Sequence, residues 1–270
     1  MSEPAKVAVI DIGSNSIKLL VARRGTNCGR VKPVHEAALT ARISAGINRA
    51  EPRLSDEGMR VGLRAIEALL AEVAPHQPRA IQLVATSAVR DALNRNEFIN
   101  HVRQSTGHTV RTLTGTEEAN FIGRGLRADP TLADAEDYYV FDLGGGSLEC
   151  LRFQQRAITT AISLPLGCVR LTERFITATE TGLDETTVRA IERHVQEALK
   201  AAAFRFDLPP VAPVVGTGGS VVACRAVIAA QRLETVEASP SELSLRALRT
   251  LRNQVVALPL ATRRQIPGLP

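Results

Sequence analysis

The 270-residue sequence contains no tryptophan, and aromatic residues make up only 3% of it. This scarcity argues against a platform on which nucleic-acid bases stack, so no nucleic-acid partner is expected. No apolar run reaches the ~18 residues that a membrane-spanning helix needs, so no membrane insertion is expected. The stretch MSEPAKVAVIDIG lacks the pattern of a secretory leader, which makes the cytoplasm the expected compartment.

Cysteine is also scarce, and its placement excludes two further classes of protein. The four cysteines, Cys28, Cys150, Cys168 and Cys224, show no CxxC spacing. That pattern argues against a structural zinc site and against a disulfide framework. The five histidines are likewise without metal-type spacing. The composition is otherwise ordinary for a globular chain, with 44% hydrophobic and 23% charged residues.

The net charge of +5 is unevenly distributed along the chain. Residues 1–126 carry 17 Lys and Arg against 12 Asp and Glu, whereas residues 127–270 carry 16 of each kind. Most of the basic residues are arginines, whose forked guanidinium suits phosphate oxygens. An arginine-rich solvated surface is the simpler interpretation of any single arginine. The asymmetry nevertheless favours an anionic ligand facing the first half.

A repeat divides the sequence into two similar halves. AVIDIGSNSIKLLVAR at residues 8–23 resembles YVFDLGGGSLECLRFQ at residues 139–154, an offset of 131 residues. Each stretch has the form strand, Asp-x-Gly-x-x-Ser turn, strand. In each half a third strand follows, then alternating helices and strands, such as a helix at 54–73 with Ser55 as its N-cap. We therefore predict an α/β protein of two related domains, 1–126 and 127–270, with a polar linker at their junction.

The two turns have the composition of phosphate-binding loops. Glycine-rich turns leave successive backbone N–H groups free to bind an anion, and glycine permits close approach. An aspartate at the end of each first strand would repel phosphate unless a cation such as Mg²⁺ lies between them. Glu149 is placed to add a second carboxylate on the following strand. A plain hairpin turn remains the alternative for either copy alone, and a third Gly-rich turn, GTGGS at 216–220, weakens it.

The three turns resemble the phosphate-1, phosphate-2 and nucleotide-side motifs of the actin, sugar-kinase and heat-shock chaperone superfamily. The closer resemblance is to the exopolyphosphatase and guanosine pentaphosphate phosphohydrolase family. VATSAVRDALN, LTGTEEA and LPLGCVRLTERF are similar to further signatures of that family, in its order and spacing. The resemblance implies two ribonuclease-H-like (actin-like ATPase) domains with an active site between them. It also implies elements beyond the IPGL segment, so the second domain is expected to lack its last ones.

The resemblance implies a role for each matching residue. Glu118 corresponds to the catalytic base, and Arg90 to an arginine that points at the anionic substrate. The implied metal-associated acids are Asp11, Asp142 and Glu149. The implied phosphate-binding residues are Gly13, Ser14, Asn15, Ser16, Gly144, Gly145, Gly146, Ser147, Gly218, Gly219 and Ser220.

From the residues alone, both TEE glutamates also fit ordinary first-turn helix chemistry, and for Glu117 that interpretation is preferred. The helix N-terminus would favour the ionised form of Glu118. Asp91 is placed to orient Arg90. Arg170 fits either a ligand or a residue that packs the domains together.

The activity that the resemblance implies is Mg²⁺-dependent removal of a terminal phosphate. Mn²⁺ is an alternative metal, and a monovalent cation such as K⁺ a further candidate. The expected substrate is inorganic polyphosphate, with guanosine penta- or tetraphosphate as the rival. A non-catalytic sensor of these compounds and an ATP-dependent kinase are the remaining classes. No Walker loop occurs. A homodimer is the candidate assembly.

Overall fold

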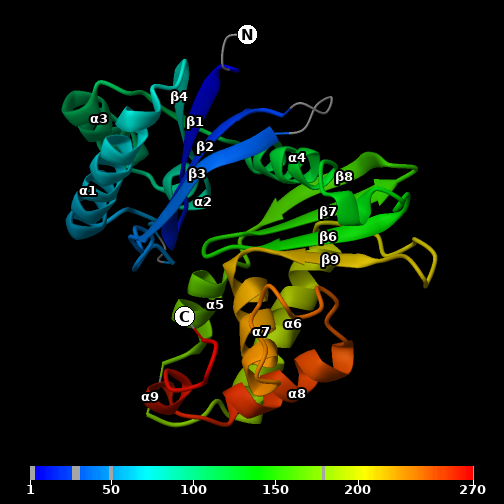
Figure 1. Ribbon diagram of the computed structural model, residues 1–270. Coiled ribbons are helices and arrows are strands. Elements are labelled where there is room, and N and C mark those ends of the chain that lie inside the picture. The colour runs from blue at the N-terminus through cyan, green and yellow to red at the C-terminus, as the bar shows by residue number, and fades with distance from the viewer. Residues whose placement is uncertain (1–3, 26–30, 49–50, 178–179, 270) are drawn as a thin grey trace.

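The computed structural model describes residues 4–25, 31–48, 51–177 and 180–269. Within them the chain forms two β-sheets, one from each half of the sequence (Figure 1). The first sheet has the order β3-β2-β1-β4-β5 and the second the order β8-β7-β6-β9. The strands of the first sheet are β1 (Lys6–Ile12), β2 (Ser16–Arg24), β3 (Val31–Thr40), β4 (Ala80–Ala85) and β5 (Val110–Thr112). Those of the second are β6 (Tyr138–Leu143), β7 (Leu148–Gln154), β8 (Ala157–Leu164) and β9 (Val214–Thr217).

The two sheets repeat the same topology. β1 pairs antiparallel with β2 and parallel with β4, and β6 pairs antiparallel with β7 and parallel with β9. The β2–β3 and β7–β8 ladders even share an irregularity of register. The internal repeat and the predicted α/β fold of two related units are therefore confirmed.

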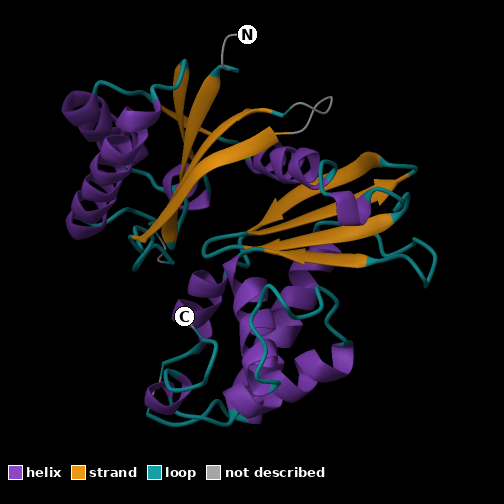
Figure 2. Ribbon diagram, in the orientation of Figure 1, coloured by secondary structure: helices purple, strands orange, loops and turns teal. Residues whose placement is uncertain are grey.

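Helices pack beside both sheets, and in the second half they lie on both faces of the sheet (Figure 2). The helices of the first half are α1 (Asp56–Val73), α2 (Ser87–Asp91), α3 (Arg95–Thr106) and α4 (Gly115–Leu126). Those of the second are α5 (Cys168–Phe175), α6 (Glu185–Ala201), α7 (Gly219–Gln231), α8 (Leu245–Val256) and α9 (Leu260–Arg263). Short 3-10 turns occur at Ala74–His76 and Pro130–Leu132.

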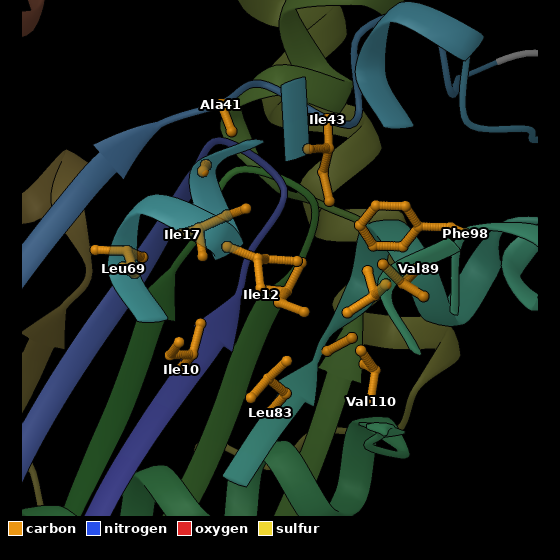
Figure 3. Close-up of a cluster of buried hydrophobic side chains, with 14 of the residues drawn as sticks. Ile10, Ile12, Ile17, Ala41, Ile43, Leu69, Leu83, Val89, Phe98 and Val110 are labelled. Atoms are coloured by element: carbon orange, nitrogen blue, oxygen red, sulfur yellow. The ribbon is translucent and has the colours of Figure 1, made fainter. Parts of the chain in front are cut away.

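The core of the first unit lies between its sheet and the helices α1 and α3. Ser55 caps α1 as predicted, because its side chain accepts a hydrogen bond from the Gly58 backbone N–H. The helical stripe of α1, which includes Leu69, packs against Ile10 and Ile12 of β1 in one buried cluster (Figure 3). Phe98 of α3 is fully buried in the same cluster. This packing fixes the ends of β1 and β4, from which the polar site projects.

One element of the first unit differs from its prediction. The apolar run at 80–88 predicts one strand, but β4 ends at Ala85 and the short helix α2 begins at Ser87. Ala88 and Val89 are fully buried against the core, so burial rather than strand pairing explains their apolar character. The turn brings Arg90 and Asp91 to the edge of the sheet, where the polar groups gather.

The helix α4 joins the two units but packs on the second. Ala119 of α4 is buried in a cluster with Val140 and Leu151, and a Cβ on Gly123 would collide with Leu151. Figure 1 shows α4 over β7 and β8, opposite the helices α5 to α8. The domain boundary at 126/127 stays a prediction, and this packing favours one that lies before α4.

Candidate active site

The two glycine-rich turns close in the same way. The Gly13 N–H donates to the Ser16 carbonyl at 3.2 Å, and the Gly144 N–H donates to the Ser147 carbonyl at 3.1 Å. Each turn joins the first two strands of its unit, and in Figure 1 the tips of the two hairpins approach each other. The repeat seen in the sequence therefore extends to the hydrogen bonding of the turns.

The two turns also contact each other directly. A Cβ on Gly146 would collide with the hydroxyls of Ser14 and Ser87, and one on Gly145 would crowd Asn15. Ser14 and Ser87 share a buried hydrogen bond of 2.9 Å between their Oγ atoms. The asparagine side chain is exposed, whereas Ser14 and Ser147 are buried. The glycines are thus required for the close approach of the two halves at this point.

Acidic side chains from both halves line a single cavity of about 1030 Å³. Asp11 comes from β1, Asp142 from β6 and Glu118 from the first turn of α4, and Lys18 lies on the same wall. Away from these charges the wall is formed mainly by apolar residues of the first sheet and of α4. The cavity therefore has a charged end at the carboxyl ends of the strands, the usual ligand position in α/β sheets.

Glu149 lies directly behind this charged end. It faces Asp142 across the β6–β7 ladder and is only 2% exposed. Ser163 of β8 donates a hydrogen bond of 2.7 Å to its carboxylate. Sequence reasoning missed Ser163, although the strand alternation of AISL places it opposite Glu149 on the neighbouring strand. Burial raises the pKa values of Glu149 and Asp142.

One carboxylate oxygen of Asp11, Oδ1, is buried and lacks a hydrogen-bond partner. Burial raises the pKa of this carboxyl, and the charge of Asp142 adds to the rise. A cation would satisfy the orphaned oxygen. Among residues 4–25, 31–48, 51–177 and 180–269, no three acidic, His or Cys side chains form a ready metal cage. The arrangement fits Mg²⁺, which is commonly held by one or two carboxylates together with substrate phosphates and water.

Glu118 has an unusual electrostatic environment. Burial and the nearby charge of Glu149 raise its pKa to about 7, although Arg90 donates a hydrogen bond of 2.5 Å to its Oε2 atom. The helix N-terminus favours the ionised form of this group, as expected, but desolvation by burial outweighs that effect. A carboxyl that ionises near neutral pH is well matched to the task of a general base.

The neighbouring Glu117 has a purely local role. Its carboxylate accepts a hydrogen bond of 2.9 Å from the Thr114 N–H, and its own N–H donates to the Thr114 hydroxyl at 3.2 Å. These two bonds form a capping box at the start of α4. Arg111 pairs with the same carboxylate at 2.5 Å. The first-turn helix chemistry that the sequence predicted for Glu117 is therefore present in the structure.

Arg90 lies between several partners at the edge of the site. Besides Glu118, it faces Asp91 at 3.4 Å and the Ser163 hydroxyl at 3.4 Å. Asp91 therefore does help to orient the guanidinium. A second cavity of about 340 Å³ opens beside Arg90 and is also lined by Ser147. The arginine is thus next to one of the predicted phosphate-binding turns.

The third glycine-rich turn reaches the site through its first glycine. Gly218 has a φ of 91°, and a Cβ there would collide with the Asp142 carboxylate and the Leu143 carbonyl. Gly219 and Ser220 form the first residues of α7. The turn therefore packs against Asp142 and places the N-terminus of α7 near the end of the second sheet.

Comparisons with known proteins agree with this geometry. The sequence model of the Ppx/GppA phosphatase family matches residues 20–269. A solved exopolyphosphatase-like protein is similar over 100% of this chain and 83% of its own, with 26% identity and a TM-score of 0.86. An exopolyphosphatase from Cytophaga hutchinsonii is similar over 97% and 83%, with 24% identity and a TM-score of 0.85. The Aquifex aeolicus Ppx-GppA enzyme is similar over 97% and 84%, with 23% identity and a TM-score of 0.76.

Within the part of the chain that the structure describes, no helix is both long enough and apolar enough to cross a membrane.

The raised pKa of Glu118 makes a prediction about stability. Because the folded-state pKa of about 7 lies above the ordinary value of 4.5, the folded state loses stability as pH rises through this interval. Replacing Glu118 with glutamine removes that cost. We expect Glu118→Gln to raise the thermal midpoint at pH 8 and to raise it much less at pH 5. A thermal midpoint of Glu118→Gln at pH 8 that is equal to or below that of the wild type would contradict the raised pKa of Glu118.

Proposed function

The chain belongs to the Ppx/GppA phosphatase family, and from that premise we propose that it is an exopolyphosphatase that hydrolyses the terminal phosphate of inorganic polyphosphate. The observation that carries the proposal is the position of Glu118. This carboxyl ionises near neutral pH, and it shares a cavity with Asp11 and Asp142, each of which lies two residues before a glycine-rich turn. A base, a cation site and anion-binding turns are the parts that phosphoryl transfer to water requires.

In the proposed mechanism Glu118 accepts a proton from the attacking water. Arg90 holds the Oε2 atom of Glu118 and thereby fixes the direction of its carboxylate. The group must be ionised to accept the proton, and a pKa of about 7 lets it take up and release a proton near neutral pH. Since the cavity end is partly buried, bulk water does not screen the charges that act on the substrate.

The substrate's phosphates are assigned to the two turns, Gly13–Ser16 and Gly144–Ser147. Apart from the Gly13 and Gly144 N–H groups, which close the turns, their backbone N–H groups would supply the donors at the ends of β1 and β6. Arg90 borders the Gly144–Ser147 turn at the smaller cavity and supplies positive charge there. Gly218, next to Asp142, and the start of α7 at Gly219 and Ser220 complete this polar rim.

Asp11, Asp142 and Glu149 are the residues proposed to hold Mg²⁺, with Mn²⁺ as the alternative metal. The orphaned oxygen of Asp11 supports a cation at this end of the cavity. When bound, Mg²⁺ would offset the negative charge of the phosphates and orient them. Three buried carboxylates facing a polyanion would otherwise repel it. K⁺ as a further cation, a cytoplasmic location and a homodimer remain proposals.

Polyphosphate is the proposed substrate because the first half of the sequence carries the whole net charge of +5, mostly as arginine. Repeated charges suit a repeating anion, and the absence of tryptophan offers little for a stacked base. Guanosine pentaphosphate is the second candidate, because its phosphate groups would use the same turns and carboxylates. The presence of a base with a tuned pKa favours an enzyme over a non-catalytic sensor.

The assignment of the base predicts a large loss of turnover. Glu118→Gln should lower kcat by ~10²–10⁴, the usual contribution of general-base catalysis. In the wild type kcat/KM should rise with pH through about 7, because Glu118 that is protonated in the free enzyme cannot accept a proton. The matched control is Glu117→Gln, which should change kcat by less than about threefold. The assignment is off by one residue if the control loses turnover and Glu118→Gln does not.

The metal assignment predicts a shifted Mg²⁺ requirement. Asp142→Asn should raise the Mg²⁺ concentration for half-maximal activity, since it removes a charged oxygen ligand. It should also reduce the rise in thermal midpoint that Mg²⁺ causes in the wild type. Asp134→Asn removes the same charge from an exposed position and serves as the control. Identical Mg²⁺ dependence of Asp142→Asn and the wild type, in both measurements, would show that Asp142 does not hold the metal.

The substrate assignment predicts an order of specificity constants. We expect kcat/KM to be higher for short polyphosphate chains than for guanosine pentaphosphate, and higher for either than for ATP. Added salt should lower kcat/KM for polyphosphate, because mobile ions screen its charged contacts. The measurement compares chains of graded length with both nucleotides at fixed salt. A clear preference for guanosine pentaphosphate would transfer the assignment to the second candidate.

A further inference from the structure

Four residues of alternating charge form a ladder that crosses from one half of the molecule to the other. Arg170 of α5 pairs with Asp91 of α2 through a short contact between its Nη2 atom and Oδ2. The other oxygen of Asp91 lies 3.4 Å from Nε of Arg90. Arg90 in turn reaches Glu118 at 2.5 Å. The candidate base is therefore the last member of a row that begins in the second half.

The ladder is well shielded along most of its length. The side chains of Arg170, Arg90 and Glu118 are 12%, 18% and 13% exposed, and Asp91 is 33% exposed. Partly buried pairs of this kind are screened by salt far less than surface pairs. The loss of one member would remove an ion-pair partner from each of its neighbours at this depth, which is costly. Each link therefore constrains the position of the next.

Arg170 also holds the second phosphate-binding turn. Its Nε donates a hydrogen bond of 2.7 Å to the Gly146 carbonyl. The neighbouring N–H groups of Cys168 and Val169 bind the Gly144 and Gly145 carbonyls at 3.0 and 2.9 Å. One guanidinium thus connects the turn that is proposed to bind phosphate with the aspartate that orients Arg90.

The two halves also have a packing contact that does not involve the Arg170 side chain. Glu173, one turn further along α5, already binds the first half by accepting hydrogen bonds from the Gly46 N–H at 2.8 Å and the Asn48 N–H at 3.3 Å. These contacts lie at the exposed edge of α5 and touch neither Arg90 nor Glu118. The helix also accepts a hydrogen bond of 3.4 Å from Asn48 Nδ2 at the Arg170 carbonyl. Among these contacts of the described residues, the one through the Arg170 guanidinium leads to the base.

We propose that Arg170 is a positioning residue, which acts through Asp91 and Arg90 to place Glu118 relative to the Gly144–Ser147 turn. The inference rests on the proposed function, because it assumes that Glu118 is the base. Because Arg170 and Asp91 belong to different halves, the ladder also ties α2 of the first half to α5 of the second.

The test measures phosphate release from polyphosphate by Arg170→Met in two backgrounds, wild type and Glu118→Gln. We expect Arg170→Met to lower kcat by ~10–100-fold with KM within about threefold, the size of effect that misplacement of a reacting group produces. In the Glu118→Gln background the same substitution should cost less than about threefold, because the group that it positions is already absent. Asp91→Asn should behave like Arg170→Met in both backgrounds.

Two controls come from the same helix. Arg174→Met removes an equal charge from α5 at a residue outside the ladder and should leave kcat unchanged. Glu173→Gln weakens the packing contact, and any effect it has should be the same in both backgrounds. Should Arg170→Met fail to fold, Arg170→Lys takes its place. A single ammonium cannot serve Asp91 and the Gly146 carbonyl together, so we expect an intermediate loss of kcat that also disappears in the Glu118→Gln background.

The outcomes separate the inference from the proposed function. If Glu118→Gln retains the wild-type rate, or the wild type releases no phosphate, the proposed function fails and the positioning role fails with it. If Glu118→Gln loses activity while Arg170→Met retains it, only the positioning role is overturned. An equal loss from Arg170→Met in both backgrounds also overturns it, because that result describes a structural residue.

Discussion

The close contact of the two glycine-rich turns is the constraint on which the rest of the site depends. Gly146 lies so near to Ser14 and Ser87 that no side chain fits between them. Because each turn begins at the end of the first strand of its unit, this contact sets the ends of β1 and β6 side by side. The aspartates that end these strands, and the first turn of α4, then line one cavity. The two copies of the sequence repeat thus contribute one aspartate each to a single polar site.

The carboxyl groups of that site are electrostatically unfavourable for the folded state, and this cost points to a role other than stability. Four carboxyl groups, Asp11, Glu118, Asp142 and Glu149, all have pKa values raised chiefly by burial. A fold selected only for stability would not gather buried acids that have so few cationic partners. Arg90 offsets part of the cost at Glu118, and Lys18 part of it at the two aspartates. The remaining imbalance is what a bound cation and its phosphate ligands would correct.

Sequence patterns predicted the parts of this arrangement that are local. The alternation of the hairpins, the N-cap at Ser55 and the capping chemistry of Glu117 each depend on residues a few positions apart, so the sequence displays them directly. The duplicated Asp-x-Gly-x-x-Ser turns predicted the shared topology for the same reason. Burial misled the prediction of a strand over residues 80–88, because the apolar character of Ala88 comes from the core rather than from a strand. The pKa of Glu118 could not be read from its helix position, because the desolvation and the charge of Glu149 that raise it come from a distant part of the chain. The partnership of Arg170 with Asp91 joins residues 79 positions apart, and no pattern of spacing announces it.

The central claim is that water, activated by Glu118, attacks the terminal phosphorus of the substrate. The most direct measurement is a single turnover of short-chain polyphosphate in water enriched in oxygen-18. Attack on the terminal phosphorus forms the new bond in the released phosphate and breaks its bridge to the chain. The account predicts one labelled oxygen in each released phosphate and none in the shortened chain. Label in the shortened chain, or phosphate released without label, would contradict it.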